Sequence, residues 1–191
     1  MPFTFKQCFT TDGIKIEGLV EVFPKVFKDS RGYFMESYSQ KDYYAAGLDL
    51  NFVQDNQSSS VKGVLRGLHF QKKYPQGKLV RVIQGEVFDV AVDLRHGSAS
   101  LGKWFAVVLS GKEQNQFYIP PGFAHGFLVL SETCVFSYKC SDFYHPEDEG
   151  GIIWSDPDVG ITWPGLNMDY MLSEKDMKLP PFALLAAEEK K

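Results

Sequence analysis

LVRVIQGEVFDVAVDL, the run from residue 79 to residue 94, decides the fold. Its two apolar and β-branched segments, 79–83 and 87–94, flank a Gln-Gly-Glu turn signal, which is typical of two strands joined by a tight turn. Strand alternation places Asp89 and Asp93 on one face of the second segment, opposite most of its apolar residues. A row of two carboxylates is more often solvated than catalytic, so we expect this face to be exposed.

Short strands separated by turns also make up the rest of the central region. The turn signals include Ser110-Gly111-Lys112. Many short strands at this spacing are typical of a sandwich, a jelly roll or a barrel, so the predicted fold class is all-β. Besides the two strands above, the predicted central strands are 65–71, 104–109, 116–119, 127–130 and 133–138.

The N-terminal part is predicted to add strands and one short helix. Residues 19–27 are mostly β-branched and aromatic but contain Pro24, which favours an edge strand. A turn signal at 29–32 precedes a predicted returning strand at 33–38. Residues 39–48 carry the signals of a short capped helix that a glycine ends.

The C-terminal part is predicted to be mostly irregular. Residues 154–165 are rich in Pro, Asp and Trp and indicate an ordered loop, while 173–176 begins like a helix cap. A length of 191 residues fits one domain. We therefore expect a single domain over 1–191, with a core at about 18–181 and a tail at 182–191.

Composition bounds the function. A net charge of −4 and a pI near 5.6 argue against a nucleic-acid partner. The odd cysteine count, with Cys8, Cys134 and Cys140 in no CxxC spacing, favours buried thiols in a reducing compartment. The N-terminus has no signal-peptide pattern and no window is long enough for a membrane span, so a cytoplasmic protein without a membrane partner is predicted.

Alternation also predicts which side chains point inward. In the strand that runs through Tyr138, the more apolar face carries that tyrosine, which puts its hydroxyl in a cavity. In the strand that contains His69, alternation places Arg66 on the opposite face from the histidine, unless a bulge intervenes at Gly67.

The pairing of His69 with Lys78 is the strongest chemical signal. A lone strand histidine is more often structural than catalytic. Here, however, Lys78 lies just across a turn, and Gly67 leaves room beside the ring. A histidine can take a proton while a nearby ammonium stabilises the resulting negative charge. The pair therefore favours proton abstraction from a carbon next to a carbonyl.

His125 ends a Pro-x-Gly-x-x-His pattern, which is the second half of the cupin signature. The first half requires His-x-His, but His69 is followed by Phe70 and Gln71. The usual ligand set for a metal is therefore incomplete, and a jelly roll without a metal is favoured. His96 and His145 are predicted to be surface loop residues.

The segment 29–36 combines an arginine, aromatic residues and a carboxylate. Locally this pattern favours a hairpin with a solvated turn. A ligand site becomes the better interpretation only with Arg66 as a second cation, because two arginines can grip a diphosphate while aromatic rings stack a base.

Together these residues resemble the dTDP-4-dehydrorhamnose 3,5-epimerase family, the RmlC-like cupins. The resemblance covers nearly the whole chain, from about Gly18 to Pro181. It implies a homodimeric cupin-type jelly roll (a double-stranded β-helix) with N-terminal strands and short flanking helices. The matching segments are 27–36, 52–56, the His69 stretch, 76–81, 88–94, 119–127, 138–139 and 173–176.

The resemblance also implies a reaction. It would convert dTDP-4-dehydro-6-deoxy-D-glucose to dTDP-4-dehydro-L-rhamnose for cell-envelope polysaccharide such as lipopolysaccharide O-antigen, without a metal or organic cofactor. By the same resemblance, His69 is the base at C3 and C5, Asp176 fixes its tautomer, Lys78 stabilises the enolate, and Tyr138 returns a proton on the opposite face.

The substrate-binding residues are likewise implied by the resemblance alone. Arg31 and Arg66 would hold the diphosphate. Phe34 and Glu36 would contact the thymidine side, either from the same subunit or from a partner subunit. The remaining residues implied near the substrate are Gln54, Asn56, His125 and Glu149.

Three alternatives stay open. Relatives that act at C3 only, at C5 only or as ketoisomerases share the fold and much of the site. A metal-dependent cupin is disfavoured by the missing His-x-His. A non-catalytic nucleotide-sugar binder has no need of a base, an acid and an oxyanion cation together.

Overall fold

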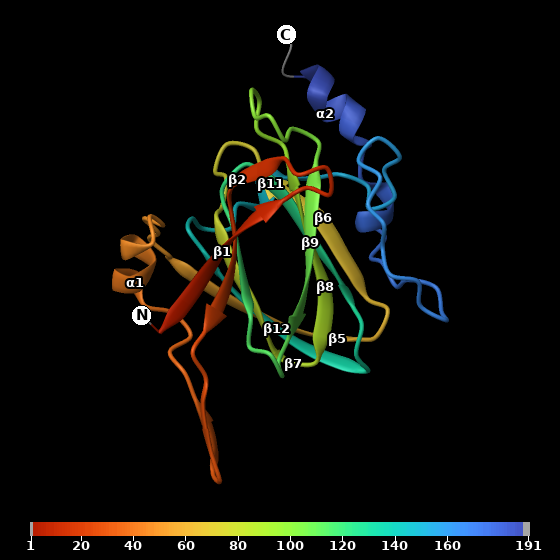
Figure 1. Ribbon diagram of the computed structural model, residues 1–191. Coiled ribbons are helices and arrows are strands. Elements are labelled where there is room, and N and C mark those ends of the chain that lie inside the picture. The colour runs from red at the N-terminus through yellow and green to blue at the C-terminus, as the bar shows by residue number, and fades with distance from the viewer. Residues whose placement is uncertain (1, 189–191) are drawn as a thin grey trace.

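Two antiparallel sheets face one another in the computed structural model, which describes the backbone of residues 2–188 and the side chains of 2–185 (Figure 1). The all-β jelly-roll prediction is confirmed. In spatial order, the first sheet contains β1 (Phe3–Phe9), β2 (Lys15–Pro24), β10 (Gln116–Ile119), β7 (Lys78–Gln84), β12 (Thr133–Cys140) and β5 (Gln54–Val61). The second contains β13 (Glu149–Gly151), β6 (Leu65–Gln71), β11 (Phe123–Val129), β8 (Glu86–Asp93) and β9 (Trp104–Ser110).

The predicted central strands are all present, with ends that differ by at most a few residues. The turn between β7 and β8 falls at Gly85, as predicted. Gly85 has a φ of 89°, and a Cβ there would clash with the backbone of Thr133, so only glycine fits this turn.

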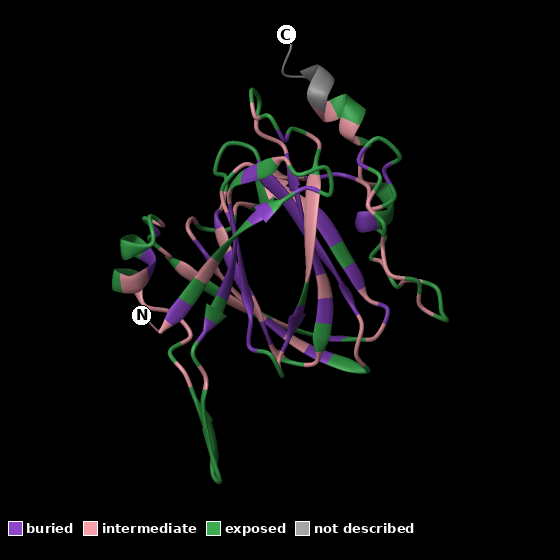
Figure 2. Ribbon diagram, viewed as in Figure 1, coloured by how far each residue is buried: buried purple, intermediate pink, exposed green. Residues whose placement is uncertain are grey.

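The main core lies between the sheets, where the inward faces of both are buried (Figure 2). Burying each large apolar side chain contributes about 1.5–3 kcal/mol. This core spans both sheets and includes Val80, Val82, Val87, Leu109, Phe117, Ile119, Phe127 and Phe136.

Two further clusters cover the outer faces. Helix α1 (Gln40–Ala45) inserts Tyr43 against the first sheet, beside Val20 and Val22. Ser39 caps this helix by accepting a hydrogen bond from the backbone N–H of Asp42, which confirms the predicted capped helix.

The C-terminal segment covers the outer face of the second sheet. Ile152 and Val159 pack there against Val90 and Val92. This segment contains the 3₁₀ turns η1 (Pro146–Asp148) and η2 (Asp176–Lys178) and the helix α2 (Phe182–Glu188).

Part of the expected 182–191 tail is helical. Phe182 and Leu185 of α2 pack against the same outer cluster. Residues 189–191 and the side chains of 186–188 lie outside the described part of the chain.

The N-terminal prediction of an edge strand is wrong. β2 lies between β1 and β10, and β1, which was not predicted, is at the edge. Pro24 is the last residue of β2 and pairs with Phe3, so the proline ends the strand instead of marking an exposed edge.

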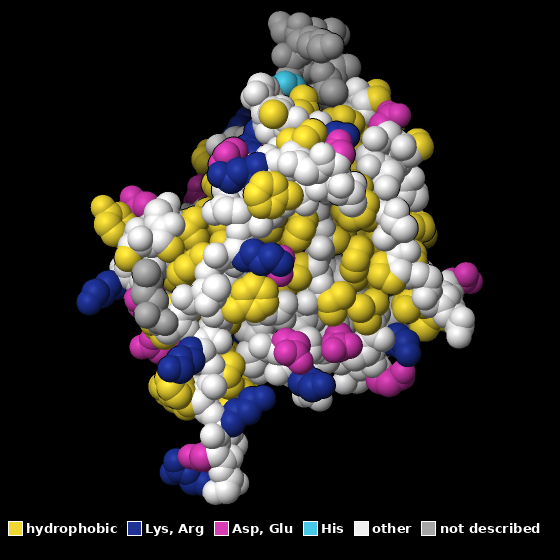
Figure 3. All heavy atoms as spheres, viewed as in Figure 1, with side chains coloured by type: hydrophobic (Ala, Val, Ile, Leu, Met, Phe, Trp, Pro, Cys, Tyr) yellow, Lys and Arg dark blue, Asp and Glu magenta, His cyan; other side chains and the backbone are white. Residues whose placement is uncertain are grey.

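The predicted returning strand at 33–38 is much shorter than expected. β3 (Phe27–Asp29) and β4 (Gly32–Phe34) pair only with each other and form a hairpin that projects from the body (Figure 1). Charged side chains lie at its far end, and hydrophobic ones lie nearer the body (Figure 3).

A bulge in β6 decides what the main cavity contains. His69 pairs with His125, yet Arg66 pairs with Phe127, so β6 carries one extra residue between these pairs. A Cβ on Gly67, where φ is 113°, would lie 2.6 Å from the Cα of Gly126, so this close approach requires glycine.

The bulge turns Leu68 into the outer cluster and leaves Arg66 and His69 facing the same cavity. Among the described residues, no helix is long and apolar enough to cross a membrane.

Candidate active site

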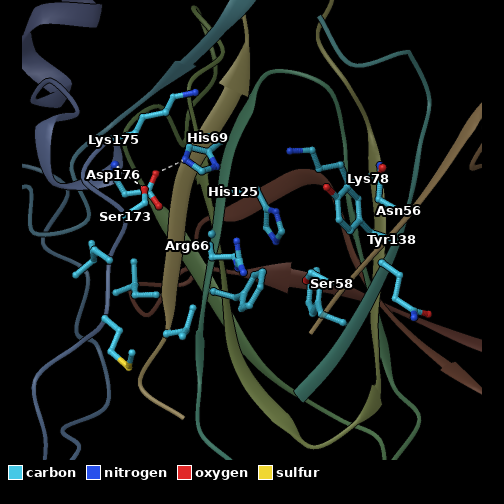
Figure 4. A pocket seen from close by; sticks show the side chains of 18 residues that line it. Asn56, Ser58, Arg66, His69, Lys78, His125, Tyr138, Ser173, Lys175 and Asp176 are labelled. Atoms are coloured by element: carbon cyan, nitrogen blue, oxygen red, sulfur yellow. Dashed lines mark hydrogen bonds and ion pairs between the residues drawn. The ribbon is translucent and has the colours of Figure 1, made fainter. Parts of the chain in front are cut away.

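A cavity of about 620 Å³ opens between the two sheets (Figure 4). The second sheet supplies Arg66, His69 and His125, and the first supplies Lys78 and Tyr138. The segment 171–176, which ends in η2, completes the wall next to His69. Groups from opposite sheets can therefore act on the two faces of a ligand held between them.

His69 and Asp176 form a close pair at one wall. The Nε2 of His69 lies 2.6 Å from the Oδ1 of Asp176, and the carboxylate is buried while the imidazole remains 29% exposed. The backbone N–H of Asp176 donates to the Oγ of Ser173, which fixes the start of η2. The pairing of these two residues, 107 positions apart, is thus present in the structure.

Lys78 and Tyr138 face this pair from the opposite wall (Figure 4). Desolvation lowers the pKa of Lys78, and nearby negative groups act against that change. Desolvation also raises the pKa of Tyr138, which keeps its phenol protonated at neutral pH. The inward direction predicted for Tyr138 is confirmed.

His125 lines the cavity and forms a hydrogen bond with Asp89, a pairing that the sequence analysis did not predict. Both carboxylate oxygens of Asp89 lie near the Nε2 of His125, at 3.0 and 3.1 Å. Burial raises the pKa of Asp89, although the bond from His125 acts in the opposite direction.

The prediction that Asp89 and Asp93 lie on a solvated face is wrong, since neither is exposed. The more apolar face of β8 points outward instead, where the C-terminal segment covers Val90 and Val92. The local signs were Val87 and Ala91, two apolar residues on the face that carries the two carboxylates.

Polar groups continue along the cavity beside Tyr138. Asn56 lines the cavity and accepts a hydrogen bond of 3.1 Å from Gln54, which lies just outside the lining. Arg66 donates to the Oγ of Ser60 at 3.2 and 3.3 Å. Arg66 and Asn56 are therefore available to a ligand, and Gln54 supports Asn56.

Glu149 lies near the catalytic candidates but is not part of the cavity lining. It accepts a hydrogen bond of 2.6 Å from the Tyr144 hydroxyl and forms an ion pair of 2.6 Å with Lys175. Desolvation acts to raise the pKa of Glu149, but these two bonds outweigh it and lower the pKa. Lys175 lines the cavity and was missed, although it directly precedes Asp176 in the matching segment 173–176.

Arg31, Phe34 and Glu36 are not brought to this cavity. Arg31 is exposed on the β3–β4 hairpin and forms an ion pair of 2.6 Å with Asp29. Phe34 is 68% exposed on the same hairpin. Within one subunit, these three residues and the cavity are separate features.

The other histidines and the cysteines lie away from this chemistry. His145 stacks on Tyr74, and His96 lines a smaller cavity beside α2. The three cysteines are buried free thiols, as predicted. Among the described residues, no three His, Cys, Asp or Glu side chains are grouped so that they could hold a metal ion.

Comparisons with known proteins agree with this geometry. The sequence profile of a family described as dTDP-4-dehydrorhamnose 3,5-epimerase matches residues 13–183. The chain is similar to the enzyme of that name from Methanothermobacter thermautotrophicus, with 55% identity over 87% of this chain and 90% of the relative. The corresponding Pseudomonas aeruginosa protein is 54% identical over 84% and 88%.

A solved structure extends the similarity to three dimensions. The dTDP-6-deoxy-D-glucose-3,5-epimerase RmlC of Legionella pneumophila, in complex with dTDP-4-keto-L-rhamnose, aligns with a TM-score of 0.89 and 49% identity. The alignment covers 97% of this chain and 96% of the Legionella chain.

Proposed function

The chain belongs to the dTDP-4-dehydrorhamnose 3,5-epimerase family and is an isomerase that acts on a nucleotide sugar, and on that premise we propose that His69 and Tyr138 exchange the protons at C3 and C5 from opposite faces of the sugar. The substrate is dTDP-4-dehydro-6-deoxy-D-glucose and the product is dTDP-4-dehydro-L-rhamnose. The observation that carries the proposal is the position of His69 and Tyr138 on opposite walls of one cavity.

Proton abstraction is the first step. When the Nε2–H of His69 donates to Asp176, its Nδ1 keeps a lone pair that can take a proton from carbon. The C–H electron pair then forms the C=C bond of an enolate, and the C4 oxygen becomes negative. Asp176 stabilises the imidazolium, and the ammonium of Lys78 stabilises the oxyanion.

Proton return completes each inversion. The Tyr138 phenol, kept neutral by desolvation, donates its proton to the enolate carbon from the other face, and the C4 carbonyl forms again. Solvent then reprotonates the phenolate and takes the proton from His69. The 4-keto group acidifies both C3 and C5, so one oxyanion site serves both centres.

Two arginines can grip a diphosphate, and the described lining of the cavity in one subunit contains one. Arg66 is the arginine inside the cavity, and Arg31 lies on the projecting hairpin with Phe34 and Glu36. The exposed Phe34 pairs with Phe27, which is 50% exposed, as expected for an arm that packs on another chain. In a homodimer, the arm of the second copy would bring Arg31, Phe34 and Glu36 to the diphosphate and thymidine. Asn56 and His125 would contact the rest of the substrate, while Gln54 supports Asn56 and Glu149 holds Lys175.

The remaining proposals concern the cofactor, the domain organisation and the cellular context. Only protons move, so the residues named above suffice and no metal or organic cofactor is required. The chain acts as a single domain in the cytoplasm, without a nucleic-acid or membrane partner, and supplies an L-sugar nucleotide for envelope polysaccharide such as O-antigen.

Proton NMR of the substrate in D₂O tests the proposal directly. The wild type should place deuterium at both C3 and C5 and produce signals of the L-sugar. Tyr138→Phe should still incorporate deuterium but form little L-sugar, because removal of a proton remains possible while its return on the opposite face does not. His69→Asn should show neither process, although it still binds dTDP.

Other outcomes contradict the proposal in distinct ways. Deuterium at one carbon only would identify a single-centre epimerase. Binding without exchange would identify a nucleotide-sugar binder. Full activity in Tyr138→Phe would require another proton donor.

A further inference from the structure

A single serine hydroxyl holds Arg66, the arginine of the cavity. The Nε and Nη2 of Arg66 donate to the Oγ of Ser60 at 3.3 and 3.2 Å. Arg66 lies on β6 of the second sheet and Ser60 on β5 of the first, so this contact joins the two sheets beside the cavity. Among the described residues, no carboxylate forms an ion pair with Arg66, and the Oγ of Ser60 forms no other hydrogen bond.

Arg95, which lies away from the cavity, is held in a different way. Its Nε and Nη2, the same edge of the guanidinium, donate to the two carboxylate oxygens of Asp93 at 2.9 and 2.7 Å. A carboxylate fixes the guanidinium, but it also neutralises the positive charge. Ser60 fixes the same edge of Arg66 with an uncharged oxygen. Arg66 is therefore held in one orientation while its charge stays available to a ligand.

The contact with Ser60 leaves the second edge of the guanidinium free. A guanidinium donates from a side edge, formed by Nε and Nη2, and from an end edge, formed by Nη1 and Nη2. Ser60 occupies the side edge of Arg66, and the parallel N–H groups of the end edge match two oxygens of a phosphate. The one carboxylate in the described lining of the cavity is Asp176, which is bonded to His69 and does not compete for this edge.

Strand alternation explains why Ser60 reaches Arg66. Along β5, exposed residues alternate with covered ones, and Ser60 is buried whereas Ser59 is exposed. Asn56 and Ser58, which share the face of Ser60, line the cavity. Ser59 is therefore a chemically identical residue on the outer face of the same strand, and it provides a matched control.

We propose that Ser60 is a positioning residue for substrate binding: it holds the side edge of Arg66 with a neutral oxygen, so that the end edge meets the diphosphate with its full charge. The inference rests on the proposed contact between Arg66 and the diphosphate. Ser60 acts through Arg66 and not on the substrate itself. Because the long side chain is already ordered before the ligand arrives, less entropy is lost on binding.

Binding of dTDP and steady-state kinetics test the positioning role. Ser60→Ala should raise the Kd for dTDP and the KM for the sugar nucleotide about five- to tenfold, as expected for the loss of one hydrogen bond. Its kcat should stay within about twofold of the wild type, because the proton-transfer groups are untouched. Ser59→Ala should change neither constant. A fall in kcat at constant KM, or equal effects of the two variants, would overturn the proposal.

Ser60→Asp and Ser60→Asn test whether the partner of Arg66 must be uncharged. The two side chains have nearly the same size, so the difference between the variants isolates the charge. Ser60→Asp should bind dTDP at least about tenfold more weakly than Ser60→Asn, because a carboxylate would neutralise Arg66 and repel the diphosphate. Equal Kd values, or tighter binding by Ser60→Asp, would refute the need for a neutral partner.

A double-mutant cycle shows whether Ser60 acts through Arg66. In an Arg66→Met background, Ser60→Ala should have no further effect on the Kd for dTDP, because the side chain that Ser60 holds is missing. The same loss of affinity in both backgrounds would mean that Ser60 acts on the ligand or on the fold directly, which contradicts the proposal.

NMR of the ligand-free enzyme separates this inference from the proposed function. The chain contains only four arginines, so the Nε–H signals in ¹⁵N spectra are few, and Arg66→Met identifies the signal of Arg66. Ser60→Ala should speed the hydrogen exchange of the Arg66 Nε–H about tenfold, because the bond that protects it is lost. The Nε–H of Arg95, bonded to Asp93, should exchange as in the wild type.

The two possible failures are then distinct. An unchanged exchange rate of Arg66 in Ser60→Ala would overturn the positioning role of Ser60. Unchanged dTDP binding in Arg66→Met would instead refute the contact between Arg66 and the diphosphate, and the exchange rate would still show whether Ser60 holds Arg66.

Discussion

Two histidine–aspartate pairs lie next to each other in this site and differ in what surrounds them. His69 and His125 are direct cross-strand partners on β6 and β11, and each is bonded through Nε2 to a buried carboxylate. The side chain of His69 is 29% exposed, but that of His125 is only 9% exposed. Asp176 comes from the C-terminal segment, whereas Asp89 comes from the neighbouring strand.

The comparison shows that environment, not residue type, separates a proton-transfer group from a positioning group. A base must reach both its orienting carboxylate and the substrate, and the more open His69 can do so. His125 lies deeper, and its aspartate is fixed in the core between the sheets. The same two residue types therefore serve different functions a strand apart.

Replacement of each histidine by asparagine gives the largest expected difference. His69→Asn should lower kcat roughly 10³-fold, because general-base catalysis contributes about 10²–10⁴. His125→Asn should cost only about tenfold, the equivalent of one hydrogen bond of about 1.5 kcal/mol. Initial rates from product NMR measure both, and similar losses in the two variants would erase the distinction.

Among the two aspartates, the one that pairs with His69 should matter more for turnover. Asp176→Asn should reduce kcat by roughly 10², because the amide no longer fixes the tautomer of His69 or stabilises its imidazolium. Its KM should change little, since Asp176 acts through His69. A large rise in KM at constant kcat would instead make Asp176 a substrate-binding residue.

Lys175, the residue directly before η2, forms an ion pair with Glu149 of β13. Replacing Lys175 should disturb only the pair of His69 with Asp176, and should disturb it less than replacing Asp176 does. Lys175→Met should lower kcat about two- to fivefold, as expected for a partly exposed ion pair worth about 0.2–1 kcal/mol. The matched control is Lys178→Met, whose partner Glu174 is well exposed. Equal effects in both variants would show that the ion pair does not hold Asp176 in place.

The two buried carboxylates of β8 should have opposite effects on stability. Desolvation acts to raise the pKa of Asp93, but bonds from Arg95, Ser100 and Ser98 outweigh it, so the folded-state pKa lies below that of the unfolded chain. Asp93 therefore stabilises the fold above pH 3.8, and this contribution is lost as the pH falls through the folded-state pKa. Asp89 has a raised pKa, so the folded state prefers its neutral form.

Thermal unfolding at several pH values checks this contrast. Asp93→Asn should lower the Tm at pH 7 by about 2–4 °C per kcal/mol lost, and the deficit should shrink below about pH 4. Asp89→Asn should leave the Tm unchanged or raise it, because asparagine resembles the neutral carboxyl. A larger Tm loss in Asp89→Asn than in Asp93→Asn would make Asp89 primarily structural.

The sequence alone determined most of the local features. The strands from β6 to β12, the helix that Ser39 caps and the inward direction of Tyr138 all follow from short-range patterns of apolar residues and turn formers. Such patterns are reliable because alternation and capping depend on neighbours in the chain. The placement of His69 and Lys78 around one cavity could be predicted from the sequence for the same reason.

The family resemblance implied the pair of His69 with Asp176, but only the tertiary structure revealed the pair of His125 with Asp89. Alternation identified two faces of β8 but predicted that the carboxylate face is exposed. Both faces are buried, because the C-terminal segment covers the outer face and the sequence of β8 does not encode that cover. The bulge at Gly67 likewise depends on its close approach to Gly126 of another strand. Burial and register are set by contacts between distant segments, and these contacts turned two similar histidine–aspartate pairs into one candidate base and one buried support.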